Sequence, residues 1–189
     1  MTLNIAKTIR RSLVAIPIGL ICLSVSGCLK DEDNISEEYV EWRDKNLKYL
    51  EEAEALTDEN GNAYYERIVP SWATNTFALV HWYNDRSLTE KNLSPMDNST
   101  VQITYELYNI DGDTISTSYA SRDSLYTSKP YQNIIGVWAP LTQMHVGDSV
   151  KIVIPYQAGY GERKYGNIPP YSTLVYNIKL KAITAYEVP

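Results

Sequence analysis

The residues most able to form a chemical site lie in one stretch of the chain, residues 134–176. Aromatic and aliphatic side chains recur there at the ends of the expected strands and helix, where side chains can converge on one concave surface. The chain has 16 Tyr against a single Phe. Because tyrosine combines apolar bulk with a polar tip, we expect such a site to hold an apolar group and to carry hydroxyl groups at its rim.

Other kinds of site find little support in the sequence. His81 and His145 are far apart, and neither has the spacing of a metal ligand. There is no nucleophile elbow and no phosphate-binding glycine loop. Asn109, Asp111 and Asp113 are spaced like calcium ligands, but no glutamate closes the loop. We therefore expect neither a metal nor a cofactor.

The elements that must position this stretch are mostly strands. Val101, Ile103, Tyr105 and Leu107 alternate with polar residues, and an Asp-Gly turn follows at 111–112. A short helix is predicted near 139–144 and a long loop at 157–172. The pattern predicts an antiparallel α+β fold with that helix on one sheet face. Strands are predicted at residues 64–69, 76–83, 101–108, 114–119, 149–154 and 173–182.

A longer helix is predicted ahead of these strands, from Ser36 to Leu56. Ser36 can cap its first turn, which is acidic, and apolar residues recur at steps near three and four. This apolar stripe needs a partner. Two readings remain open: the helix docks on its own domain, or it forms a contact with a second copy or a client protein.

The N-terminal segment has the layout of an export signal. Three cations precede an apolar run at residues 13–25 that is short for a membrane span. The run ends Val-Ser-Gly-Cys, which resembles a bacterial lipobox and implies cleavage before Cys28 and acylation of that residue. An ordinary signal peptide and an uncleaved anchor are the alternatives. The expected organisation is a signal peptide at 1–27, an acylated tether and amphipathic helix at 28–62, and one domain at 63–189.

Charge limits the partners of the mature chain. Residues 1–27 hold three of the 17 basic residues and no acidic one, so their removal takes the formal net charge from −6 to −9. This balance argues against nucleic acid as a partner. The acidic run at residues 30–33 resembles the surface-export signals of some Bacteroidetes lipoproteins. The alternative is that it is only a solvated tether. We expect lipid anchoring in the bacterial outer membrane, on its periplasmic face or at the cell surface.

A series of short motifs extends through the C-terminal half of the chain, and a block at 101–119 precedes it. Their order resembles that of the FKBP-type peptidyl-prolyl isomerases, whose pattern reads Val-Ile-x-Gly-Trp, Met-x-Val-Gly, a strand ending in Pro, a Tyr-Gly loop, Ile-Pro-Pro and Leu-x-Phe. The matching residues are Ile134–Trp138, Met144–Gly147, Val150–Pro155, Gly159–Gly161, Ile168–Pro170 and Leu174–Tyr176.

The resemblance implies a twisted antiparallel sheet of five to six strands wrapped around one short helix. It also implies isomerisation of X–Pro bonds in exported or envelope proteins, without a cofactor. Taken singly, each matching residue is better explained as a core residue; as a set, they favour a pocket. The implied roles are Trp138 as the floor, Tyr105 and Tyr176 as walls, Tyr160 as a hydroxyl donor, Ile115, Ile134 and Ile135 as lining with the Ile135 N–H as a donor, and Ile168 as the lip.

This sequence also departs from the family pattern. Ile115-Ser116 stands where the family has Phe-Asp, so one wall is smaller and a carboxylate is missing. The residue directly before Trp138 is Val137 and not glycine, and the segment from Trp138 to Met144 is one residue short. These departures favour an alternative, a binding lipoprotein of the same fold with weak or no catalysis.

Overall fold

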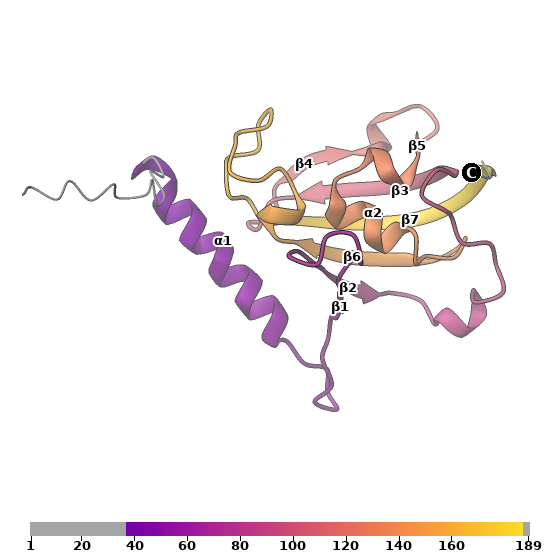
Figure 1. The fold of residues 1–189 in the computed structure, drawn as a ribbon, viewed down its shortest axis with the longest axis horizontal. Coiled ribbons are helices and arrows are strands. Elements are labelled where there is room, and N and C mark those ends of the chain that lie inside the picture. Colours follow the sequence, from indigo (N-terminus) through magenta and orange to yellow (C-terminus); the bar gives the residue numbers. More distant parts are fainter. Residues whose placement is uncertain (1–36, 187–189) are drawn as a thin grey trace, which may run out of the picture. The chain divides into compact units, whose positions relative to one another are not determined.

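The computed structural model describes residues 37–186, which lie within one unit spanning residues 35–189. Its main feature is a sheet of seven strands in which every pairing is antiparallel (Figure 1). The spatial order is β1-β2-β6-β7-β3-β4, and β5 also pairs with β3. The strands are β1 (Glu66–Ile68), β2 (Ala78–Trp82), β3 (Thr100–Tyr108), β4 (Thr114–Thr117), β5 (Tyr126–Ser128), β6 (Ser149–Ile154) and β7 (Leu174–Ala185).

The antiparallel α+β architecture expected from the sequence is confirmed, with one additional strand. β5 lies between the predicted strands at residues 114–119 and 149–154, where the sequence predicted no strand. It pairs with the start of β3, from Val101 to Ile103, while β4 pairs with the end of the same strand. Three residues are too few to show the alternation by which a strand is recognised in a sequence.

The helix α2 (Ile135–Leu141) packs on one face of the sheet and begins four residues before the predicted position. Gly136 allows the close approach, because a Cβ atom there would lie 2.2 Å from Cγ2 of Ile154 on β6. Pro140 is tolerated near the end of this short helix, where its missing N–H removes one hydrogen bond. The core between α2 and the sheet includes Val137 and Leu141.

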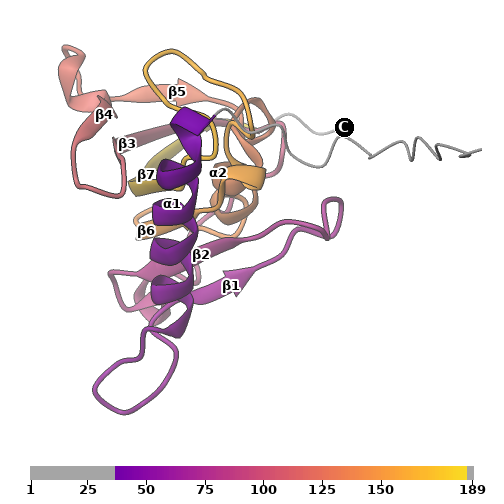
Figure 2. The same ribbon diagram turned by 90° about the vertical axis from the view of Figure 1, so that its left-hand side faces the viewer.

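The helix α1 (Glu37–Ala55) packs on the opposite face of the sheet. Leu50 and Ala53 contact Leu79 of β2 and Val153 of β6, whereas the next residues on those strands face the α2 core. Successive side chains of a strand point to opposite faces, so the two helices cover different faces. Figure 2 shows α1 in front of the sheet. The contacts match the first of the two readings given above, docking of the helix on its own domain.

A buried carboxylate fixes the turn that leads into β6. Asp148 has no exposed surface and accepts hydrogen bonds from the side chains of Asn84 and Thr89 and from the backbone N–H of His145. The Arg86 guanidinium lies 3.6 Å away. Burial acts to raise the pKa of Asp148, but the hydrogen bonds and the arginine together hold it below its ordinary value.

Four short 3₁₀ helices complete the described chain: η1 (Arg86–Leu88), η2 (Ser118–Ala120), η3 (Pro130–Gln132) and η4 (Tyr156–Ala158). Within residues 37–186 no helix is long and apolar enough to cross a membrane. The predicted signal peptide, Cys28, the acidic run and the Ser36 cap lie outside the described residues.

Candidate functional site

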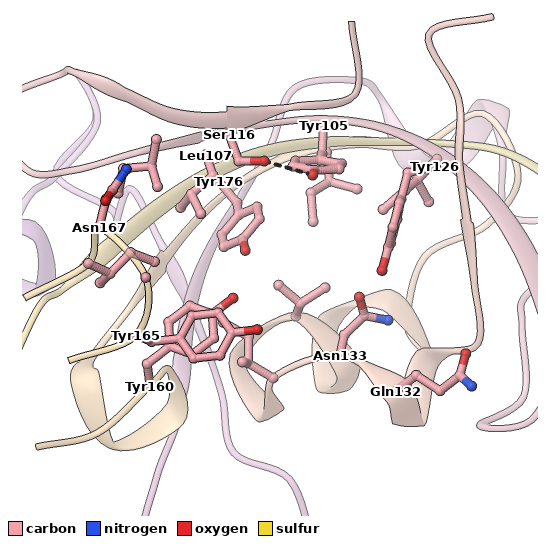
Figure 3. A pocket seen from close by; sticks show the side chains of 17 residues that line it. Tyr105, Leu107, Ser116, Tyr126, Gln132, Asn133, Tyr160, Tyr165, Asn167 and Tyr176 are labelled. Atoms are coloured by element: carbon pink, nitrogen blue, oxygen red, sulfur yellow. Dashed lines mark hydrogen bonds between the residues drawn. The ribbon is translucent and has the colours of Figure 1, made fainter. Parts of the chain in front are cut away.

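A cavity of about 430 Å³ opens between α2 and the sheet face that α2 covers (Figure 3). Its size is within the range of small-molecule and peptide-side-chain pockets. Four strands (β3, β4, β5 and β7), α2, the segment before α2 and the loop after η4 all contribute side chains. The lining residues are Ile103, Tyr105, Leu107, Ile115, Ser116, Tyr126, Gln132, Asn133, Ile134, Val137, Tyr160, Tyr165, Gly166, Asn167, Ile168, Tyr176 and Ile178.

Three of the four rings singled out in the sequence meet around this cavity. Tyr105 on β3 and Tyr176 on β7 are neighbours, with ring centroids 6.0 Å apart. Tyr160 enters from the loop after η4 and stacks on Tyr165, with centroids 4.2 Å apart and planes 7° from parallel. Tyr126 of β5 meets Tyr105 edge to face at 5.5 Å. The walls of the cavity are therefore aromatic on several sides.

The hydroxyl groups of these rings form two pairs. Tyr105 Oη lies 3.0 Å from Ser116 Oγ (Figure 3), so the residue that replaces the family's carboxylate still meets a tyrosine hydroxyl. Burial raises the pKa of both Tyr160 and Tyr176, and a hydrogen bond between their side chains acts to lower the pKa of Tyr160 and raise that of Tyr176. The hydroxyl groups of Tyr160 and Tyr176 thus meet at the cavity wall.

Trp138 does not line the cavity, and the expectation that it forms the floor is wrong. Its indole Nε1 donates to Asp97 Oδ1 at 2.5 Å, and its ring packs against Trp72 with centroids 4.7 Å apart. Consecutive residues of an α-helix are turned by about 100° from each other. The rotation of α2 about its axis that directs Val137 into the cavity therefore directs Trp138 to the neighbouring surface.

Val137 takes the position expected for the tryptophan. Aligning Gly136-Val137 with the family's Gly-Trp also removes the one-residue deficit between the tryptophan and Met144. In this register the family's glycine is Gly136, whose contact with Ile154 leaves no room for a Cβ atom. Two apparent departures of the sequence thus become one substitution, a valine at the floor.

Of the four aliphatic residues predicted to line the cavity, three do so and one does not. Ile115, Ile134 and Ile168 line the cavity, as their predicted roles require, whereas the Ile135 side chain packs against the core and does not line it. The shift of register assigns the lining position of the family's isoleucine to Ile134. The N–H donor role given to Ile135 moves with it.

Sequence reasoning missed several polar residues and rings of the cavity. Tyr126 lies on the unpredicted β5, and Tyr165 lies in a loop where no periodicity applies. Asn133 and Gln132 precede α2, in the segment whose register was misassigned. The sequence did contain one signal for the rotation of α2, which is Gly136. A glycine inside a helical segment often has a packing reason, so it could have identified the face of the helix that contacts the sheet.

The chemistry open to this cavity is binding and reorientation of a ligand. It offers apolar and aromatic surface with a few hydroxyl and amide groups, and neither His81 nor His145 lines it. Among residues 37–186, His, Cys, Asp and Glu side chains form no group of three or more that could hold a metal ion.

Comparison with known proteins identifies relatives of this chain. The family model described as FKBP-type peptidyl-prolyl cis-trans isomerase matches residues 91–181. The FKBP-type peptidyl-prolyl cis-trans isomerase FkpA of Escherichia coli K12 is 29% identical over 134 residues, 69% of this chain and 48% of the relative. The FKBP-type 22 kDa isomerase of the same organism is 35% identical over 91 residues, 47% of this chain and 43% of the relative. The chain thus spans about half the length of these curated relatives.

Two solved structures share the fold. The crystal structure of FkpA from Escherichia coli has a TM-score of 0.60 and 25% identity, covering 77% of this chain and 62% of that one. A peptidyl-prolyl cis-trans isomerase from Pseudomonas syringae has a TM-score of 0.61 and covers 81% of this chain and 98% of that one. At 19% identity the second likeness shows the fold alone.

Proposed function

Because the chain belongs to the family of FKBP-type peptidyl-prolyl cis-trans isomerases, we propose that it isomerises X–Pro bonds of peptides bound in the tyrosine-lined cavity. The observation that carries the proposal is the meeting of Tyr105, Tyr160 and Tyr176 around one open cavity of about 430 Å³. These rings come from β3, the loop after η4 and β7, so only the fold brings them together.

The reaction needs no nucleophile. The C–N bond of an X–Pro amide must lose its partial double-bond character and twist, against a barrier of about 18–20 kcal/mol. A cavity that excludes water stabilises the less polar twisted amide relative to the planar one, and fixed donors orient the carbonyl. In this proposal Tyr105 and Tyr176 hold the proline ring against Val137. The Tyr160 hydroxyl and the Ile134 N–H donate to carbonyl oxygens of the peptide.

A second candidate function is peptide binding without turnover. Val137 offers a smaller floor than an indole, and Ser116 is neutral where the family has a carboxylate. Removal of one preorganised polar group from an active site can lower kcat by about 10²–10³. The same substitutions leave the apolar walls that bind a peptide, so binding would survive where catalysis does not.

The test is the rate of cis–trans exchange in an Ala-Xaa-Pro-Phe peptide series, measured by exchange NMR with the chain from residue 28 onward. We expect faster exchange in its presence, reduced at least tenfold by Tyr160→Ala. The matched control is Tyr83→Ala, because Tyr83 is a tyrosine outside the cavity whose hydroxyl donates to Asn177. Peptide shifts that titrate without faster exchange would establish the binder; no titration and no exchange would reject both functions.

We also propose that the protein acts in the bacterial envelope, held to the outer membrane by an acylated Cys28, on proline-containing segments of exported proteins. The support is the sequence alone: the lipobox-like residues 25–28, and a formal charge of −9 after removal of residues 1–27, which argues against binding to an anionic membrane surface by charge. Metabolic labelling with an alkyne fatty acid should mark the wild type and spare Cys28→Ser, which should leave the membrane fraction. Equal labelling of both proteins would reject the anchor.

A further inference from the structure

The loop between η4 and β7, residues 159–173, supplies one side of the cavity and is here called the lip loop. Tyr160, Tyr165, Asn167 and Ile168 all come from it. Within the loop, the backbone groups of Tyr165 and Ile168 bond to each other at 3.0 and 2.9 Å. A loop of this length with so little regular structure needs anchoring if its side chains are to keep a fixed geometry.

The anchor comes from α1, more than 120 residues away in sequence. Trp42 Nε1 donates to Ser172 Oγ at 3.0 Å, and the Thr173 backbone N–H donates to Asn46 Oδ1 at 2.7 Å. The Thr173 hydroxyl donates in turn to the Asn46 carbonyl at 3.2 Å. Asn46 is 0% exposed and Thr173 1%. All three bonds join the helix to the last two residues of the lip loop.

The choice of asparagine at this helix position has a physical reason in the loop. Asparagine is a poor helix former, and a fully buried amide is unfavourable unless its groups are paired. Both groups of Asn46 are paired, since Nδ2 donates to the Trp42 carbonyl at 2.8 Å and Oδ1 accepts from Thr173. An alanine would suit the helix better but would leave the buried Thr173 N–H without its acceptor.

The contact also reaches toward the cavity. Ser172 Oγ, which accepts from Trp42, donates to the Pro169 carbonyl at 2.8 Å. Pro169 directly follows Ile168, which lines the cavity and is buried. A chain of hydrogen bonds in which each hydroxyl both accepts and donates is strengthened along its length. The helix is thus connected to the lip by two routes, through Asn46 and through Trp42.

We propose that α1 is a positioning element of the cavity, with Asn46 and Trp42 as the positioning residues that hold the lip loop in its ligand-binding conformation. The kinetic part of this inference rests on the isomerase function proposed above. The helix then does more than connect the domain to the N-terminal segment: it fixes the side of the cavity that carries Tyr160, Tyr165 and Ile168.

The test compares Asn46→Ala with Leu50→Ala in the full chain. Leu50 lies one turn further along α1 and packs on Leu79 and Val153 of the sheet, away from the lip loop. We expect Asn46→Ala to speed hydrogen exchange of the Tyr165 and Ile168 amides about tenfold and to raise KM for the peptide about tenfold, with a smaller change in kcat. Leu50→Ala should lower the unfolding temperature and leave both amides and KM within twofold of wild type.

Trp42→Phe guards against a variant that fails to fold, because it keeps an aromatic ring at this position and removes the donor to Ser172. It should speed exchange of the same two amides by about threefold. Unchanged exchange in Asn46→Ala and Trp42→Phe, or equal changes in Leu50→Ala, would overturn the proposal. Hydrogen exchange needs no turnover, so a chain without isomerase activity would reject the proposed function and still give a result here.

Discussion

Replacing Val137 with tryptophan tests the assignment of the cavity floor. The side chain of Val137 is buried at the base of a cavity of about 430 Å³, which has room for a larger ring. An indole face against a proline ring would remove on the order of 60 Å² of apolar surface from water, which is about 1.5 kcal/mol at about 25 cal/mol per Å². That free energy corresponds to about a tenfold rise in kcat/KM.

The matched control is the neighbouring residue. Trp138→Phe removes the indole N–H that meets Asp97 and leaves the cavity unchanged, so kcat/KM should stay within twofold of wild type. Both variants would be measured in the peptide exchange assay, with urea unfolding to show that each is folded. A tenfold loss of activity in Trp138→Phe would refute the floor assignment. So would an unchanged kcat/KM in a folded Val137→Trp chain that binds peptide no better than wild type.

Three further perturbations follow from the packing and the hydrogen bonds. Tyr176→Phe removes the hydroxyl that pairs with the Tyr160 hydroxyl, so kcat/KM should fall about threefold to tenfold while the free energy of unfolding in urea changes by about 1 kcal/mol or less; a larger loss of stability would show that the hydroxyl serves the core. Gly136→Ala places a Cβ atom 2.2 Å from Ile154, and the unfolding free energy should fall by about 1–3 kcal/mol; an unchanged value would contradict the tight α2–β6 contact. The pKa of Asp148 is lower in the folded than in the unfolded chain, so its stabilising contribution is present above its ordinary value near 3.8 and is lost as pH falls through the folded-state value. Asp148→Asn should therefore weaken the fall of the unfolding free energy at acid pH. A variant whose unfolding free energy falls with pH as steeply as that of the wild type would contradict a stabilising role of the Asp148 carboxylate.

The parts of the fold that the sequence predicted well are those with a regular local pattern. β3 was recognisable from the alternation of Val101, Ile103, Tyr105 and Leu107, and three of those four side chains join the buried core. The turn at residues 111–112 connects β3 and β4 as expected, and Gly112 has the positive φ that favours glycine. Alternation and turn chemistry are local, so they survive without knowledge of the tertiary structure.

The candidate site was harder to predict because it depends on a rotation about one helix axis. Trp138 and Val137 differ by one position, and the sequence offers a large ring at the first and a small side chain at the second. The prediction chose Trp138 because the family's motif has a tryptophan at the floor of the pocket. The contact of Gly136 with Ile154, which sets the rotation of α2, exists only in three dimensions.

The anchoring of the lip loop was invisible for a related reason. Asn46 interrupts the apolar stripe of α1, and the structure buries it against Thr173, 127 residues later in the chain. A polar residue inside a helical stripe carries no signal about which distant backbone group it pairs with. Long-range hydrogen bonds of this kind are seen only in the three-dimensional structure.

The measurement that tests the account most directly is two-dimensional exchange NMR of an X–Pro peptide with a small molar fraction of the wild-type chain, with the amide spectrum of the chain recorded in the same sample. The account predicts cis–trans exchange faster than in peptide alone, together with shifts at Tyr160, Tyr176 and Val137. Exchange at the uncatalysed rate while those three residues shift would contradict catalysis. Faster exchange without any shift at them would contradict the assignment of the cavity as its site.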